Sequence, residues 1–322
     1  MNKQCVTAVS GLALALSAGA AHASCGSAFC VLNTEWATQG LASEPGSFRL
    51  DERFEFIDQK HLMQGTKKIS QADDTADTTE LRTINRNLLT TLGYTFTKSW
   101  AVSASVPIVD RSHSHIEDPT GADGGPFHEA WNFTKLGDVR LLGMYQFENE
   151  KNPQVSYGLT FGLKLPTGSY KVTNDDGKEA ERALQPGTGS TDAVIGAYYS
   201  GPSFGQDASW FAQVLYQQAA LVKDDFKPGN QFQLNLGYRL PLAHDFQALV
   251  QLNTLIKGRD TGGNAENDLS GSRTMFVSPG LAYSVTHDFQ LYTFVQVPVY
   301  RNYNGIQLSV DYAVVGGATL RF

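Results

Sequence analysis

The sequence predicts an all-β fold, a closed antiparallel transmembrane β-barrel of about twelve strands in an up-and-down meander. Apolar and polar residues alternate with a period of two in many short segments, as they do along strands. The segments between them alternate between long and short, which is typical of outer-membrane barrels. No apolar run in the body of the chain approaches the roughly 20 residues of a spanning helix. The mean hydropathy of −0.25 suits a barrel, because only every second strand residue meets lipid.

The amino terminus is expected to be a cleaved secretory signal peptide. Lys3 gives a short positive start, residues 6–21 are almost all small or apolar, and Ala21-His22-Ala23 matches an A-x-A cleavage pattern. A spanning helix would need a longer apolar run. We therefore expect a signal peptide at 1–23, a periplasmic or plug-like segment at 24–46 and an outer-membrane barrel of a Gram-negative bacterium at 47–322.

Two cysteines remain after cleavage, Cys25 and Cys30. Export to an oxidising compartment favours a local disulfide between them. A metal-bound or haem-linked pair is the alternative, but the spacing fits neither C-x-x-C nor C-x-x-C-H. Acylation of Cys25 is a further alternative, although His22 stands where a lipoprotein signal normally has Leu. No cofactor is expected.

The last strand shows the alternation most clearly. Between residues 308 and 322 the even positions are apolar, small or aromatic, and the odd positions are mixed to polar. The chain stops on Phe322, and a terminal aromatic resembles the signal through which barrel assembly machinery recognises its substrates. The same alternation predicts eleven earlier strands, at 48–56, 88–96, 100–108, 139–147, 155–165, 193–199, 210–216, 231–240, 246–253, 275–285 and 289–299.

The connections separate a membrane barrel from a soluble sandwich. Long links at 59–82, 110–131, 169–188, 221–229 and 258–270 alternate with shorter ones at 98–99, 149–152, 201–208, 243–245 and 286–288. A meander with long external loops and short periplasmic turns has this pattern. A soluble sandwich has no reason to sort its loop lengths by parity. The brief link around 302–304 is an exception.

The two strand faces indicate which side meets lipid. Charged and amide side chains would be costly in a dry core, so the consistent arrangement places apolar residues against lipid and polar residues in a wet lumen. Aromatic residues near the strand ends suit an interfacial girdle. The charges of the polar face are mixed, which argues against strong ion selectivity, and they could simply pair and partly fill the lumen. The candidate lumen-lining residues are Arg49, Asp51, Arg53, Glu55, Asp138, Arg140, Lys164, Gln233, Asn235, Arg239, Gln251 and Asp311.

Several positions expected to face inward are apolar. They could pack a narrow constriction or line a path for a poorly soluble aromatic solute, and the sequence does not separate these readings. They are Leu142, Met144, Phe211, Leu215, Leu249, Tyr292 and Phe294.

Three histidines lie close together in the sequence. His113 and His115 would both face the upper lumen if their strand continues, and His128 follows in the same predicted loop. An i, i+2 pair on a strand can ligate one metal ion; a solvated rim is the alternative. Ser112 beside His113 is a poor hydrolase dyad, because adjacent strand residues point to opposite faces.

Five stretches of the sequence carry a resemblance to a known family: Leu163-Lys164-Leu165-Pro166-Thr167-Gly168, residues 184–190, 277–283, 297–300 and 305–322. In these stretches the chain resembles the outer-membrane transporters grouped as MetA-pathway of phenol degradation. The resemblance implies passage of small, possibly aromatic or hydrophobic solutes. The lack of a nucleophile-base pair argues against enzymatic activity. An outer-membrane barrel is expected to contact outer-membrane lipid and lipopolysaccharide. The alternatives are a barrel enzyme acting on lipid at the outer rim and a metal-responsive or structural barrel. A net charge of −7 argues against a nucleic-acid partner.

Overall fold

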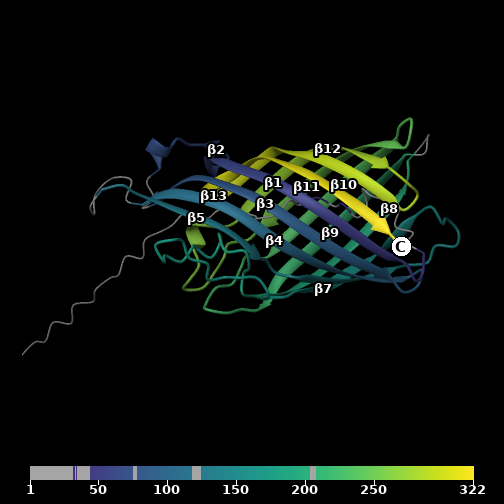
Figure 1. The fold of residues 1–322 in the computed structure, drawn as a ribbon, viewed down its shortest axis with the longest axis horizontal. Coiled ribbons are helices and arrows are strands. Elements are labelled where there is room, and N and C mark those ends of the chain that lie inside the picture. Colours follow the sequence, from purple (N-terminus) through teal and green to yellow (C-terminus); the bar gives the residue numbers. More distant parts are fainter. Residues whose placement is uncertain (1–31, 33, 35–43, 75–77, 118–124, 204–207) are drawn as a thin grey trace, which may run out of the picture.

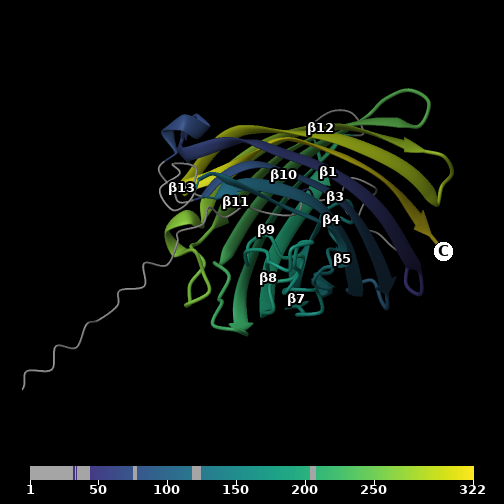
Figure 2. The ribbon, with the colours of Figure 1, turned by 60° about the vertical axis from the view of Figure 1, so that its left-hand side comes forward.

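The computed structural model describes residues 32, 34, 44–74, 78–117, 125–203 and 208–322, and these form one closed antiparallel barrel whose strands run obliquely around it (Figures 1 and 2). The expected signal peptide and both cysteines of the expected disulfide lie outside the described residues. The strands are β1 (Phe48–Gly65), β2 (Lys67–Lys68), β3 (Thr78–Thr95), β4 (Trp100–Glu117), β5 (Phe127–Leu136), β6 (Arg140–Gln146), β7 (Ser156–Lys164), β8 (Thr191–Pro202), β9 (Ser209–Leu221), β10 (Gln231–Pro241), β11 (Phe246–Lys257), β12 (Ser272–Ser284) and β13 (Phe289–Arg321).

The barrel closes between β13 and β1. Residues 290–303 of β13 pair with β12, and residues 303–321 pair with β1, both antiparallel. Element β13 therefore reverses direction near Gly305, whose φ of 65° lies in the left-handed region that glycine tolerates. Counted by passes, β13 supplies two strands and the wall has the twelve that the alternation predicts. Because the barrel is closed, the wall has no open strand edge whose backbone groups would lack hydrogen-bond partners in lipid.

Two strands lie outside this wall. β2 pairs with residues 63–64 of β1, and β5 pairs with residues 108–117 of β4. The sequence placed residues 110–131 in a loop, but β4 continues to Glu117 and β5 begins at Phe127. The outward-facing residues of β4 explain the difference. Ile108 is apolar and suits a lipid-facing position, whereas Ser112 and Ser114 are polar. The β4–β5 hairpin therefore extends in register above the membrane.

The outer surface of the barrel is apolar, with exposed Val, Leu, Ile and aromatic side chains on nearly every strand. At the end that carries the short turns, aromatic rings pack against each other around the wall. The ring centroids of Phe48 and Tyr94 are 4.6 Å apart, and those of the stacked pair Phe246 and Tyr283 are also 4.6 Å apart. Further pairs are Trp100–Tyr145, Phe147–Tyr157 and Tyr199–Trp210. This ring of aromatics matches the interfacial girdle of a membrane barrel.

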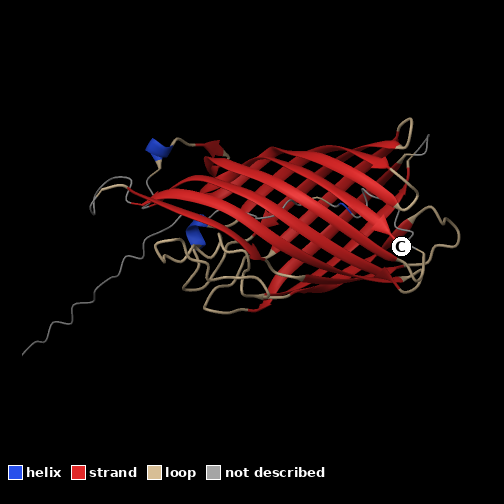
Figure 3. Ribbon diagram, in the orientation of Figure 1, coloured by secondary structure: helices blue, strands red, loops and turns tan. Residues whose placement is uncertain are grey.

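The two ends of the barrel differ. The longer loops, β2 and the 3₁₀ helices η1 (Gln71–Asp73) and η2 (Asn267–Leu269) lie at the end opposite the C-terminus (Figure 3). Among the described residues, no helix has the length and apolar character needed to cross a membrane. We refer to the end with the long loops as the outer end, following the usual orientation of such barrels.

Replacing Phe322 by Ala is expected to lower the amount of folded barrel. The Phe322 ring stacks on that of Phe48, with the ring centroids 5.6 Å apart. The backbone N–H of each of these two residues donates a hydrogen bond to the carbonyl of the other, at the seam where the barrel closes. Gel mobility of unboiled samples measures the folded, heat-modifiable fraction in membranes. Leu320→Ala, a lipid-facing change on the same strand, is the matched control. Equal amounts of folded protein in all three chains would contradict the expectation.

Candidate functional site in the barrel lumen

The polar face of β1 lies inside the barrel, as the alternation predicts. Asp51, Arg53 and Glu55 are all buried. Arg53 pairs with Glu55 at 3.0 Å, and the Tyr292 hydroxyl donates to Asp51 at 3.1 Å. These side chains pair with one another and bond to neighbouring strands, so they line and partly fill the lumen.

Amides continue this lining on the opposite wall. Asn253 on β11 donates to Asn235 on β10 at 2.9 Å and to Gln251 at 3.2 Å. Gln233 is half-buried on the same inward row of β10. Arg239 donates to the Ser209 hydroxyl at 3.1 Å.

Arg49 and Asp311, the first and the last of the predicted lumen-lining residues, do not lie on the regular inward rows at the middle of the barrel. Arg49 lines a cavity of about 330 Å³ at the periplasmic end, with Met144 and Tyr198. Asp311 does not continue the regular inward row. Asp58 pairs with Tyr312 and Gln59 with Val310, so Asp311 is the extra residue of a bulge. There it accepts a hydrogen bond from the Lys60 backbone and contacts His61.

One side of the lower lumen is filled by apolar side chains. Phe211, Leu249, Tyr292 and Phe294 are buried in a single cluster, with Ile57, Ala282, Ala313 and Val315 beside them. Leu32, from the segment before the barrel, is buried in the same cluster, and the Thr34 hydroxyl accepts a hydrogen bond from Arg53. These two residues lie in the barrel interior; the expected plug-like role of 24–46 stays a prediction.

The connection between β7 and β8, residues 165–190, folds into the outer half of the barrel and is called the inward loop here. Leu184 is fully buried and packs with Ala180 against Leu62 and Leu308 of the wall and against Trp131 of β5. The Trp131 indole donates to the Lys178 carbonyl at 3.0 Å. Arg111 donates to the carbonyl of Leu184. The sequence predicted a long external loop at this position and gave no sign that it turns inward.

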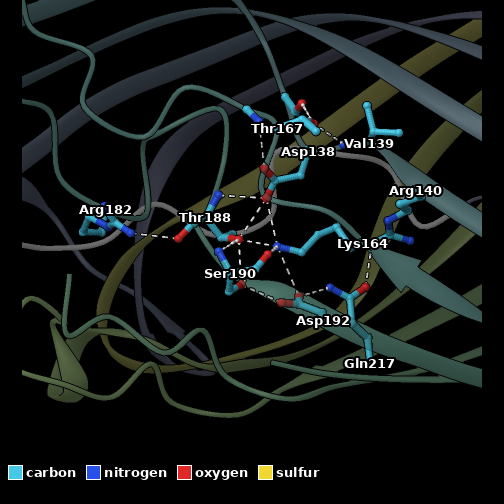
Figure 4. A network of polar contacts seen from close by, with 12 residues as sticks. Asp138, Val139, Arg140, Lys164, Thr167, Arg182, Thr188, Ser190, Asp192 and Gln217 are labelled. Atoms are coloured by element: carbon cyan, nitrogen blue, oxygen red, sulfur yellow. Dashed lines mark hydrogen bonds and ion pairs between the residues drawn. The ribbon is translucent and has the colours of Figure 1, made fainter. Parts of the chain in front are cut away.

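Both ends of the inward loop are fixed by a buried polar network around Lys164 (Figure 4). The Lys164 ammonium lies 2.9 Å from Asp138 and 3.3 Å from Asp192. It also contacts the Thr188 hydroxyl and donates to the Ser190 carbonyl at 3.1 Å. The cation is thus shared by two carboxylates and by the last residues of the loop.

The network extends across the wall to Arg140. Gln217 donates to Asp192 at 2.6 Å and accepts from Arg140 at 2.7 Å. On the loop side, Asp138 accepts from the backbone of Gly168 at 3.0 Å and of Thr188 at 2.9 Å. Asp138, Arg140 and Lys164, three of the lumen candidates, therefore act together as an anchor for the loop.

Glycine is required where the two ends of the loop meet. A Cβ on Gly168 would lie 2.7 Å from the carbonyl carbon of Gly137 and 2.8 Å from Gly187 Cα. A Cβ on Gly187 would lie 2.7 Å from the Asp138 carboxylate. Backbones this close exclude any side chain. The Leu-Pro-Thr-Gly and Pro-Gly-Thr-Gly-Ser stretches are thus the two halves of one structural site.

Above the inward loop lies a cavity of about 690 Å³, lined by residues of the loop, of β4 and β5, and of the 258–271 connection. Glu181 and Glu266 both line it. Burial raises the pKa of each carboxyl well above its usual value, and each one's neighbouring carboxylates, including Glu80, add to the effect.

The histidines are only partly brought together. His113 and His115 are buried on the inner face of β4, with His113 Nε2 and His115 Nδ1 3.3 Å apart. His128 is exposed on the other face of β5 and pairs in register with Ile116, so it does not join them. Glu117 and Glu129 lie beside His115 instead. The sequence shows that Glu117 shares a strand face with His115 and that Glu129 shares one with Trp131. It does not show that β4 pairs with β5.

The comparisons with known proteins agree with this fold. The family model described as "Putative MetA-pathway of phenol degradation" matches residues 118–305, a span that contains the inward loop and its anchor. No curated protein sequence matches the chain.

Solved structures with a similar fold are outer-membrane barrels. The COG4313 outer membrane channel from Pseudomonas putida F1 is 15% identical, with 87% of this chain and 97% of that chain covered and a TM-score of 0.62. The NanC porin is 11% identical, with 84% and 98% covered and a TM-score of 0.47. The KdgM porin in complex with disordered oligogalacturonate is 9% identical, with 85% and 99% covered and a TM-score of 0.43.

The fold and its apolar, aromatic-girdled exterior make this an outer-membrane β-barrel. The family match covers more than half of the chain and includes the glycine-dependent site that holds the inward loop. The chain therefore belongs to the family described as MetA-pathway of phenol degradation.

Proposed function

We propose that the protein is a narrow outer-membrane channel for small solutes. The observation that carries the proposal is a closed barrel with a polar inner wall and cavities at both ends, narrowed by an inward loop. Twelve strands enclose an interior between the side-chain-filled eight-stranded barrels and the open porins. The inward loop and the apolar cluster narrow it further, which suits small solutes.

Aromatic or hydrophobic solutes are the first candidates. Phe211, Leu249, Tyr292 and Phe294 place apolar surface in the lower lumen beside polar groups of β1. A small aromatic molecule that carries a hydroxyl can use both kinds of surface, as ligand sites commonly do. The family description, which concerns phenol degradation, supports the same choice.

A lipid-cleaving enzyme is less well supported. Ser112 lies on the outward row of β4, where Arg86 approaches its hydroxyl at 3.5 Å, whereas His113 is buried inside and bonds to Thr83. A serine nucleophile needs a base within hydrogen-bond reach. These two side chains are on opposite faces of one strand.

Conductance across a planar bilayer tests the proposal. Purified barrel is expected to give discrete, small openings that phenol added to one side reduces, while the same concentration of glycerol leaves them unchanged. Absence of openings, together with unchanged growth of a deletion strain on aromatic carbon sources, would defeat the channel. If glycerol and phenol reduced the openings equally, the result would support the channel function but contradict the preference for aromatic solutes.

Phe294→Ala is expected to increase the conductance and weaken the block by phenol. The ring is fully buried at the centre of the lower apolar cluster, so its removal widens the lumen there. Val295→Ala, the next residue on the lipid-facing side, is the matched control and is expected to behave as the parent chain. The same recordings measure both variants. Equal conductance in Phe294→Ala and the parent would place the narrowest point elsewhere.

A further inference from the structure

His115 and Glu117 line the cavity of about 690 Å³ above the inward loop, and together with Glu129 they form a compact group of metal-ligating side chains. His115 Nε2 lies 3.1 Å from Glu129 Oε2 and 4.0 Å from Glu117 Oε1. One ligand atom from each of the three residues falls within 4.8 Å of the other two. Two ligands bound tetrahedrally at about 2.0–2.1 Å from a zinc ion lie roughly 3.3 Å apart. The observed separations bracket that value, so small side-chain rotations are sufficient.

The strand pairing explains why these groups converge. Glu117 and His115 are two residues apart on β4 and share its inner face, and Glu129 is opposite His115 in the β4–β5 register. His115 and Glu129 are almost fully buried, whereas Glu117 is a quarter exposed toward the cavity. Two ligands are thus held rigidly by a sheet and the third lies on the solvent side, where an ion can enter.

A relay behind His115 sets its orientation. His113 Nε2 lies 3.3 Å from His115 Nδ1, and His113 Nδ1 lies 2.7 Å from the Thr83 hydroxyl. When His115 Nδ1 carries the proton and donates it to His113, the Nε2 lone pair faces the carboxylates. Partners that fix the tautomer of a ligating histidine in this way are a regular part of metal sites.

A cation already occupies this position in the structure. The Lys178 ammonium lies 2.7 Å from Glu129 and contacts Glu117, so it bridges the two carboxylates. Lys178 belongs to the inward loop and is 40% exposed, which leaves its flexible stem free to move away. The carboxylate pair is therefore built to hold positive charge, and the histidine nitrogen beside it selects for transition metals over Mg²⁺ or Ca²⁺.

We propose that His115, Glu117 and Glu129 form a binding site for a divalent first-row transition-metal ion at the outer mouth of the barrel, with the Lys178 side chain as its competitor. An imidazole with two carboxylates leaves a fourth position for water from the cavity. Binding displaces the ammonium and replaces one positive charge by two. The site is separate from the apolar cluster of the lower lumen and does not depend on the proposed transport function.

Calorimetry on the purified, detergent-solubilised full barrel with zinc chloride tests the proposal. One zinc ion per chain is expected, with weak or absent binding of calcium and magnesium chloride. His115→Ala and Glu129→Gln are expected to abolish the binding. Lys178→Met is expected to tighten it by roughly tenfold or more, equivalent to about 1.4 kcal/mol, because the competitor is gone. That gain cannot come from a variant that fails to fold.

His128→Ala is the matched control, because His128 is adjacent to Glu129 but exposed on the opposite face. It is expected to bind zinc like the parent. Quenching by copper gives a second readout: the Trp131 ring lies 4.9 Å from that of His115, so Trp131→Phe is expected to remove the quenched fluorescence. Zinc binding that survives in His115→Ala, or is lost in His128→Ala, would overturn the proposal. So would weaker binding in Lys178→Met.

Discussion

Deleting residues 171–185 and joining Tyr170 to Pro186 through two glycines is expected to raise the single-channel conductance several-fold. The inward loop places Ala180, Leu184 and the Lys178 backbone inside the outer lumen, against Trp131 and the wall. Its two ends are adjacent, because Gly187 donates a backbone hydrogen bond to the Ser169 carbonyl at 2.8 Å. The shortened chain can therefore close in a tight turn without disturbing β7 or β8.

Planar-bilayer recordings at fixed salt measure this effect. Lys171→Ala is the control within the loop, because its side chain is well exposed and pairs with Asp224 at 3.2 Å on the surface. It is expected to conduct as the parent chain does. Leu184→Asp, which disrupts the packing of the loop without removing it, is expected to give an intermediate or fluctuating conductance. Unchanged conductance in the deletion would show that the inward loop does not limit the passage.

Replacing Lys164 by Met is expected to destabilise the barrel by about 3–5 kcal/mol, because removal of one partner leaves buried charge uncompensated. The side chains of Lys164, Asp138 and Asp192 are only 6%, 6% and 4% exposed. Without the ammonium, two carboxylates face each other in a site that also fixes Thr188 and Ser190. Loss of the anchor is expected to release the inward loop and increase current noise as well.

Guanidinium unfolding of the barrel in detergent, followed by tryptophan fluorescence, measures the destabilisation. Combining Lys164→Met with Asp138→Asn and Asp192→Asn removes the uncompensated charge and is expected to recover part of the loss. Lys135→Met, an exposed lysine on β5, is the matched control and is expected to be neutral. Equal stability of Lys164→Met and Lys135→Met would show that the buried ion pairs do not hold the loop.

Much of the wall was determined by local pattern. Alternation from Phe48 onward fixed which residues face lipid, because a strand has a period of two and the two environments differ strongly in polarity. The inward placement of Asp51, Arg53, Glu55 and Asn235 follows directly. Asp311 departs from the row because a bulge shifts the register, which depends on the partner strand β1.

The class of fold, the identity of most inward-facing residues and the two motifs that meet at the loop could all be read from the alternation and the motifs along the chain. Only the folded chain shows that residues 165–190 turn into the barrel and that Asp138, Lys164 and Asp192 share one site. The same holds for Glu129, which joins His115 in place of His128. The face of a strand to which a side chain points is set by its place in the alternation along the chain. These contacts, in contrast, join residues 14 to 54 positions apart, and only strand register and loop packing bring such residues together.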